Sequence, residues 1–175
     1  MSPAPEPRRA RRDKRQAASA RQPARTRQAS RPVPGCDLSP LFRKIAPACY
    51  DHIGGVVGEE LFRHLLSQKW LSADPRTGAV GITPLGWKEL KEFGVDTELL
   101  RTTKRKPVNA CVERHGGKLY PHTGSLLGML LRDHLLELGW LEDEDGKSYS
   151  LTSRGISALL ALGIDLTRVP GAATL

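Results

Sequence analysis

The feature that most constrains the fold is an internal repeat. The segment GGVVGEELFRHLLSQKWL, which begins at Gly54, returns 70 positions later as GSLLGMLLRDHLLELGWL, which begins at Gly124. Farther along, the segments that begin at Thr83 and Thr152 match each other in Thr, Gly, Leu, Gly and Asp, with the offset reduced to 69. So many identities in one register indicate a duplication, and we expect one architecture built twice.

Each copy predicts the same order of elements. A helix with apolar residues three and four positions apart is followed by the dipeptide Trp-Leu and a turn-rich insert, ADPRTG or EDEDG. Short strands follow at Val80–Ile82 and Ser148–Leu151, and then Thr83 and Thr152 stand where the N-cap of a further helix belongs. Helix, hairpin and helix is the order of a winged helix. We therefore expect an α+β, helix-rich fold with two tandem winged-helix-like units.

Other segments fix the expected boundaries. Upstream of each long helix the sequence predicts another helix, at residues 41–52 (LFRKIAPACYDH) and 107–116 (PVNACVERHG), each with one cysteine on its apolar side. The polar segment TKRKP, at residues 103–107, is the expected linker between the units. The predicted parts are therefore an arm at residues 1–35, a first unit at 36–102 and a second unit at 103–175.

Charge separates the arm from the rest of the chain. The chain carries 27 Lys and Arg and 19 Asp and Glu, a formal net charge of +8. Residues 1–35 hold ten of these cations and only two of the acids, which leaves 17 of each sign in residues 36–175. The arm has no aromatic residue and almost no aliphatic one, so it cannot bury enough apolar surface to offset its ordering entropy. We expect it to be disordered.

A flexible cationic arm indicates a polyanionic partner. DNA is favoured over an acidic membrane, because the arm has no apolar residue to insert between lipid headgroups. A solubilising tail without a partner is the alternative interpretation of such a charge run. The candidate nucleic-acid-binding residues are the ten basic side chains of the arm: Arg8, Arg9, Arg11, Arg12, Lys14, Arg15, Arg21, Arg25, Arg27 and Arg31.

Several classes of protein are disfavoured. No stretch approaches the roughly 20 apolar residues that a membrane span needs, and the N-terminus lacks the apolar core of a secretory signal. Three cysteines form an odd and sparse set, which favours reduced thiols over a disulfide framework. We expect a cytoplasmic protein without a membrane partner. The sequence has no Gly-rich phosphate loop or nucleophile elbow, so we expect no enzyme.

Cysteine and histidine suggest one further site. Cys49 and His52 are three positions apart on a predicted helix, a spacing that can place both on one face, and the second copy offers Cys111, His115 and His122. Thiolate and imidazole suit zinc or another soft divalent ion, so Cys49, His52, Cys111 and His122 are the candidate metal ligands. The alternative is that two cysteines at matching places belong to duplicated core packing, in which case no cofactor is implied.

Four stretches carry a resemblance to a known family: CYDHIGGVVGEELFRHLL, GITPLGWKELKEFGVD, ACVERHGGKLYPHTGSLLGMLLRDHLLELGWL and YSLTSRGISALLALGID. They cover most of residues 43–166 and resemble the C-terminal half of bacterial ArsR-type helix-turn-helix transcriptional regulators. In those regulators a DNA-reading winged helix precedes this region, whereas here the arm takes its place. The resemblance implies transcriptional regulation, with DNA and a homodimer or partner regulator as partners.

The sequence thus predicts a DNA-associated transcriptional regulator of the winged helix-turn-helix type, with phosphate binding by the arm. The expected polar face of the first long helix carries Glu59 and Glu60, which phosphates would repel, and this disfavours base reading by the folded part. The alternative is an effector-sensing or protein-interaction and dimerisation module without direct DNA reading.

Overall fold

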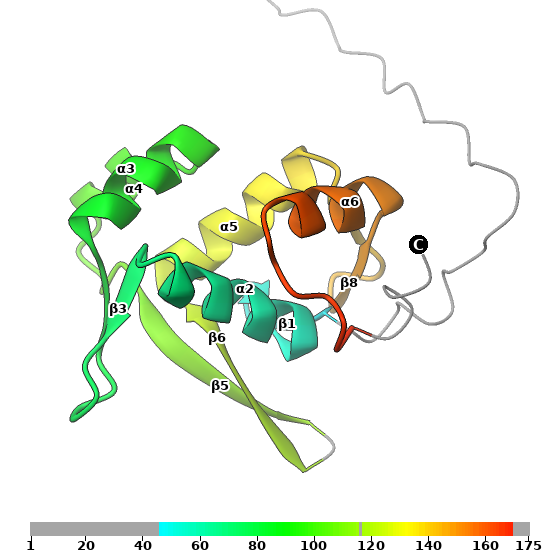
Figure 1. The fold of residues 1–175 in the computed structure, drawn as a ribbon, viewed down its shortest axis with the longest axis horizontal. Helices are drawn as coiled ribbons and strands as arrows, with labels where there is room; N and C mark the ends of the chain where they lie inside the picture. Colours follow the sequence, from blue (N-terminus) through cyan, green and yellow to red (C-terminus); the bar gives the residue numbers. More distant parts are fainter. Residues whose placement is uncertain (1–45, 116, 170–175) are drawn as a thin grey trace, which may run out of the picture. The chain divides into compact units, whose positions relative to one another are not determined.

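The computed structural model describes residues 46–115 and 117–169 (Figure 1). The predicted arm, with the ten basic residues assigned to DNA, lies outside these residues. The described part is an α+β fold, in which five helices accompany antiparallel strand pairs. No helix in this part of the chain has the length and apolar character that crossing a membrane requires.

The first copy of the repeat consists of a hairpin, a long helix, a second hairpin and a shorter helix. Its elements are β1 (Ala46–Cys49), β2 (His52–Ile53), α2 (Gly55–Ser67), β3 (Leu71–Ala73), β4 (Val80–Ile82) and α3 (Pro84–Phe93). A further short helix, α4 (Thr97–Thr102), follows, and the sequence pattern did not predict it.

The second copy follows the same order. Its elements are β5 (Asn109–His115), β6 (Lys118–Gly124), α5 (Ser125–Glu137), β7 (Leu141–Asp143), β8 (Ser148–Leu151) and α6 (Ser153–Ala161). The two long helices have the same length of 13 residues and begin 70 positions apart. The duplication in the sequence is therefore also a duplication of secondary structure.

The local predictions after each long helix are confirmed. Strands β4 and β8 have the predicted bounds. Thr83 and Thr152 are the N-caps of α3 and α6, and each side-chain oxygen accepts a hydrogen bond of 2.9 Å from the backbone N–H of Gly86 or Gly155. These side chains satisfy amide groups that the first turn of a helix leaves unpaired.

The predicted upstream helices are wrong, because the described residues of both segments form β-hairpins. In the first segment Pro47 lies in β1, and proline in the interior of a helix would remove a hydrogen bond and clash with the preceding turn. In the second segment, β5 pairs with β6 and Gly117, which precedes β6, has a φ of +79°. A Gly-Gly dipeptide in the sequence favours a tight hairpin, and the ladder of strand pairs outweighs local helix propensity.

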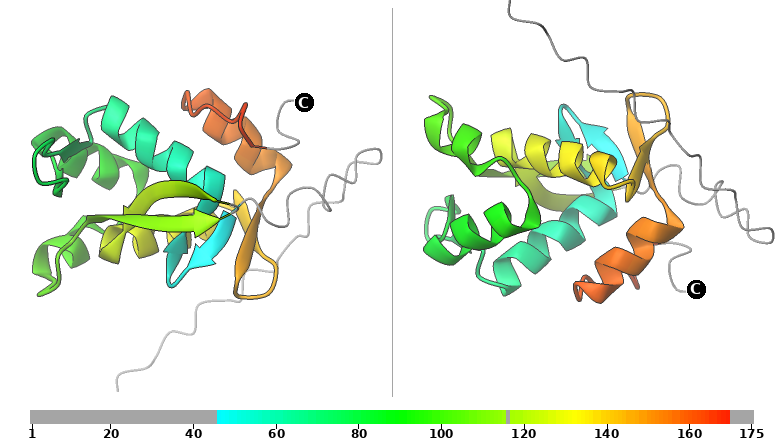
Figure 2. Two further views of the ribbon diagram at one scale, coloured as in Figure 1. Left: turned by 90° about the horizontal axis from the view of Figure 1, so that it is seen from below. Right: turned by 90° about the horizontal axis from the view of Figure 1, so that it is seen from above.

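The two copies are interleaved. Strand β1 of the first copy pairs with β8 of the second, with Ala46 opposite Tyr149, so one sheet has the order β2-β1-β8-β7 (Figure 2). One core cluster contains Val57 of α2 together with Leu135 of α5, and the other contains Leu65 of α2 with Leu131 of α5. Both cores therefore depend on both copies.

The face of α2 that was expected to be polar is partly buried. Glu60 is 2% exposed, and Glu59 is 8% exposed. Arg168, which follows α6, donates to Glu60 Oε1 at 2.7 Å and to Glu59 Oε2 at 2.9 Å, and Arg63 donates to Glu59 Oε1 at 2.9 Å. The two glutamates thus form ion pairs within the chain.

Candidate metal centre

Two hairpins bring the four predicted ligands together. Cys49 lies directly opposite His52 in the β1–β2 hairpin, and Cys111 lies directly opposite His122 in the β5–β6 hairpin. Each histidine precedes the start of its long helix by three positions. The cysteines are 62 positions apart and the histidines 70, because the β5–β6 hairpin has the longer strands. The site is therefore one Cys-His pair used twice.

The distances among these side chains fit a tetrahedral ion. Their four candidate ligand atoms all lie within 4.8 Å of one another. The two cysteine Sγ atoms are 3.9 Å apart, and the two histidine Nε2 atoms are 3.1 Å apart. A tetrahedral zinc ion with ordinary bond lengths would separate two thiolates by about 3.8 Å and two imidazole nitrogens by about 3.3 Å. Small side-chain movements would complete the shell.

Hydrogen bonds fix the tautomers of both imidazoles. His122 Nδ1 lies 2.7 Å from the carbonyl oxygen of Tyr120, and His52 Nδ1 lies 3.1 Å from Asp51 Oδ1. A carbonyl and a carboxylate only accept, so both Nδ1 atoms carry a proton and donate it. The two Nε2 lone pairs then face each other at 3.1 Å in a buried place, and a shared proton or a metal ion between them would relieve the repulsion. Metal-binding histidines ordinarily donate their other N–H in this way.

The electrostatics of the site also favour a cation. Burial, with the neighbouring Cys111 thiol and then the Glu113 and Asp51 carboxylates, raises the pKa of Cys49 to about 12. Burial lowers the pKa of His122, and the imidazole is therefore neutral, which is the form that coordinates a metal. Cys49 becomes a thiolate only when a strong positive charge replaces its proton.

Glycines at the start of the long helices make room for the histidines. A Cβ atom on Gly58 of α2 would overlap the Ile53 carbonyl and lie 3.1 Å from the Cβ of His122, which belongs to the other copy. The same addition on Gly128 of α5 would lie 2.9 Å from the Cβ of His52. Each histidine therefore packs on the glycine of the opposite copy, and a side chain at that glycine would prevent this close approach.

Sequence reasoning found these ligands for partly wrong reasons. Cys49 and His52 are cross-strand partners in a hairpin, whereas the prediction placed them on one helical face. It missed the groups that orient the imidazoles, Asp51 and the Tyr120 carbonyl, and it missed Glu113, whose Oε2 accepts from Gly55 N at 3.2 Å. A hairpin signal in the Gly-Gly dipeptide was the one local indication of the true geometry.

Comparisons with protein-family models, with curated proteins and with solved structures find no match to this chain. The resemblance to ArsR-type regulators stays a prediction from the quoted motifs.

Proposed function

We propose that this protein binds one Zn²⁺ ion through Cys49, His52, Cys111 and His122, and that the ion joins the hairpins of the two copies. The observation that carries the proposal is the pair of buried Nε2 atoms that face each other at 3.1 Å while both Nδ1 atoms have acceptors. An extra proton would also relieve this repulsion, but two sulfur atoms 3.9 Å apart beside the imidazoles favour a metal.

Four protein ligands give zinc a closed shell, which is typical of sites that stabilise a fold. Each copy supplies one cysteine and one histidine, so the ion would add a cross-link to an arrangement that already shares a sheet and two cores. Its free energy of binding would then be free energy of folding. Thiolate ligation also fits the reducing conditions of the cytoplasm.

Metal analysis of the purified protein tests this function. The full chain, purified without a chelator or a histidine tag, should contain one zinc per chain, and the variants Cys111→Ser and His122→Asn should contain little. His64→Asn is the matched control, because His64 lies on α2 away from the cluster. Cobalt replacement gives a readout that needs no variant, since tetrahedral Co²⁺ with thiolates has intense visible absorption. Less than 0.2 equivalents of any transition metal after reconstitution would reject the site.

A second candidate function is DNA association in transcriptional control, by an arm attached to two tandem winged-helix-like units. The observation that favours it is the segregation of charge, because residues 1–35 hold the whole excess of +8. Helix, hairpin and helix in each copy support the winged-helix interpretation, and the quoted motifs support ArsR-type relatives. Glu59 and Glu60 are engaged in ion pairs, so the proposal assigns phosphate binding to the arm.

Salt dependence tests DNA association. If all ten arm cations contact phosphates, the logarithm of the affinity should fall with the logarithm of salt concentration with a slope down to about −9. A full-length variant with the ten residues replaced by Gln should lose most binding to a random duplex at low salt. Unchanged binding by this variant would show that the folded part, and not the arm, contacts the DNA. Absence of binding in the wild type would favour the alternative, an effector-sensing or dimerisation module without DNA contact.

A further inference from the structure

Cys49 and Cys111 lie side by side, although 62 positions separate them in the sequence. Their Sγ atoms are 3.9 Å apart, and both residues are partly exposed. A disulfide needs the two sulfur atoms at about 2.0 Å, so a shift of about 2 Å, shared by the two side chains and their hairpins, would join them. An arrangement that suits a metal is therefore also close to that of a covalent link between the two copies.

A cleft with a volume of about 430 Å³ lies beside one member of this pair. Cys111 lines the cleft, whereas Cys49 is not among the described residues that line it. Polar side chains also line it, among them Asp51, Arg105 and Asn109. A water molecule occupies about 30 Å³ in the liquid, and hydrogen peroxide is little larger, so the cleft has room for a small polar oxidant beside Cys111.

We propose that Cys111 is the site at which hydrogen peroxide oxidises this protein, and that Cys49 then joins it in a disulfide that releases the zinc ion. The thiolate is the form of cysteine that attacks a peroxide, and a bound zinc ion holds both sulfur atoms in that form. The release of zinc rests on the proposed function. The closeness of the two sulfur atoms and the cleft beside Cys111 do not.

The reaction has two steps, and each step releases one hydroxide ion. The Cys111 thiolate attacks one oxygen of hydrogen peroxide, so that an S–O bond forms, the O–O bond breaks and a sulfenic acid remains. The Cys49 thiolate then attacks the Cys111 sulfur, so that an S–S bond forms and the S–O bond breaks. Two protons from the solvent convert the two hydroxide ions to water. The two thiolates together lose two electrons, and the peroxide gains them.

Zinc leaves after the second step, because both of its thiolate ligands are then lost. The two imidazoles that remain supply only half of a four-ligand shell. A thiol reductant would restore both thiolates, and with them the metal site. The two copies stay joined throughout, first by the metal ion and then by the covalent bond.

Peptide mapping tests the disulfide. The variant Cys36→Ser is the background, because Cys36 is the remaining cysteine of the sequence. After treatment of its zinc-loaded full chain with hydrogen peroxide, mass spectrometry should find two peptides joined through Cys49 and Cys111. A chromogenic chelator should detect one equivalent of zinc per disulfide, and little without peroxide. Dithiothreitol with added zinc should reverse both changes. Metal-free chain should form the same disulfide more slowly, since no metal then holds the thiolates.

Dimedone, which reacts with sulfenic acids, tests which cysteine the peroxide attacks. When Cys49→Ser is added to the background, dimedone should label Cys111. When Cys111→Ser is added instead, Cys49 should be labelled about tenfold more slowly, because it does not line the cleft. The two variants are matched, since each keeps one cysteine and both histidines. In concentrated urea, where the fold is lost, both cysteines should be labelled at the same rate.

Absence of the disulfide in the zinc-loaded protein would overturn the proposal, as would equal labelling of the two cysteines in the folded chain. Oxidation of Cys111 to a sulfinic acid as the sole product would also overturn it. Zinc content, measured on the same sample before oxidation, separates this proposal from the metal site: a chain without zinc rejects the metal site, and mapping of the metal-free chain still decides whether the disulfide forms. Mapping of the wild-type chain decides even if a variant fails to fold.

Discussion

His52 and His122 meet with their Nε2 atoms 3.1 Å apart, although 70 positions separate them in the sequence. Each comes from a different hairpin, and each has its Nδ1 atom engaged by an acceptor next to it in the chain. Two buried lone pairs that face each other destabilise the apo fold, so the arrangement links the stability of the protein to a bound cation.

Metal removal should therefore lower the melting temperature. At a free zinc concentration a thousand times the dissociation constant, binding to the native state alone adds about 4 kcal/mol to the free energy of unfolding. For a chain of this size that corresponds to roughly 10 °C. Differential scanning calorimetry with excess zinc and with a strong chelator measures the difference. His122→Asn should show no zinc dependence, and equal melting temperatures of the wild type in both conditions would contradict the prediction.

Substitution of the glycines under the histidines should damage both fold and site. Gly58→Ala and Gly128→Ala would each press a methyl group against a backbone carbonyl and the opposite histidine, so we expect a loss of about 2–3 kcal/mol. The affinity for zinc should fall as well, because the histidine must move. Gly81→Ala is the matched control, since its nearest neighbour would be a side-chain oxygen at 3.8 Å. Chemical denaturation and competitive zinc titration of all three variants measure these effects, and equal behaviour would show that the histidines do not depend on the glycines.

Local signals explain what the sequence predicted well. The strand at Val80–Ile82, the cap at Thr83 and the helix behind it all depend on residues within a few positions of one another. The duplication then repeated the same inference at Thr152. The spacing of apolar residues, the capping residue and the turn residues are sufficient to predict such elements from the sequence.

The hairpins could not be predicted in this way, because their partners are remote or their strands short. Strand β2 has two residues, and β1 is held by β8, about 100 positions later. Cys49 and His52 show the consequence: a spacing of three fits one helical face, and it also fits two strands joined by a two-residue turn. The ligands were right although the element was wrong. Asp51 was missed as the partner of His52, since only the hairpin directs its carboxylate toward the imidazole.

Substitution of Thr123 by Val should make the fold more stable. Its side chain is 6% exposed, and its Oγ1 atom has no hydrogen-bond partner among the described residues. The corresponding residue of the first copy is Ile53. Thr123→Val removes the unsatisfied hydroxyl at nearly constant volume, so the free energy of unfolding should rise by about 1 kcal/mol. Thr123→Ser, which keeps the hydroxyl and loses the methyl group, should be destabilised. A less stable Val variant would reveal a buried water at the hydroxyl.

The ion pairs of Arg168 should contribute strongly to stability. Among the described residues, Arg168→Ala leaves Glu60, which is 2% exposed, with only the more distant Arg63 guanidinium at 3.8 Å. Removal of one partner of a buried pair is costly, and we expect a loss of about 2–3 kcal/mol in urea denaturation. Lys88→Ala, which removes exposed pairs with Glu89 and Glu92, is the control and should change stability by less than about 0.5 kcal/mol. Adding Glu60→Gln to Arg168→Ala should recover part of the loss, because it removes the buried charge; no recovery would contradict the ion-pair explanation.

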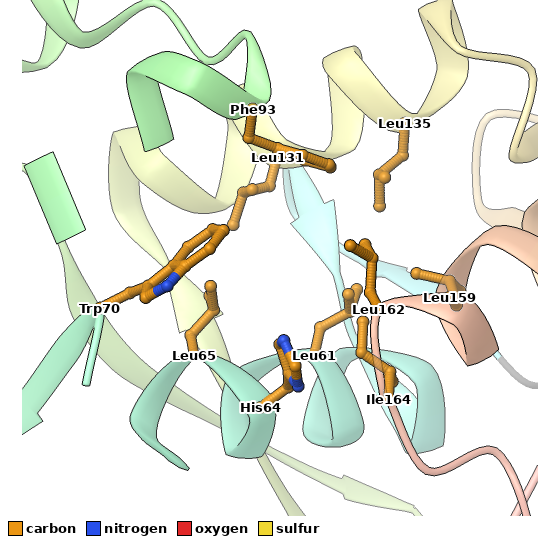
Figure 3. Close-up of a pocket in the computed structure, with 10 residues that line it drawn as sticks. All are labelled: Leu61, His64, Leu65, Trp70, Phe93, Leu131, Leu135, Leu159, Leu162 and Ile164. Carbon is orange, nitrogen blue, oxygen red and sulfur yellow. The ribbon is translucent and has the colours of Figure 1, made fainter. Parts of the chain in front are cut away.

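Acid should destabilise the fold by protonating His64, because the surroundings of this imidazole favour its neutral form. Burial lowers the pKa of this imidazole below its usual 6.5. His64 lines an apolar pocket between α2, α5 and α6, and the other nine side chains that line this pocket carry no charge (Figure 3). The neutral form is therefore favoured in the native state, so the stabilisation is complete above pH 6.5 and is lost as the pH falls through the lower native pKa. His64→Gln cannot be protonated and should lose less stability between pH 7 and pH 5 than the wild type. Because the ring is half-exposed, we expect a difference of less than about 1 kcal/mol. Urea denaturation of both proteins at each pH, with the same metal content, cancels the titration of the metal site; parallel stability curves would show that His64 is not the group responsible.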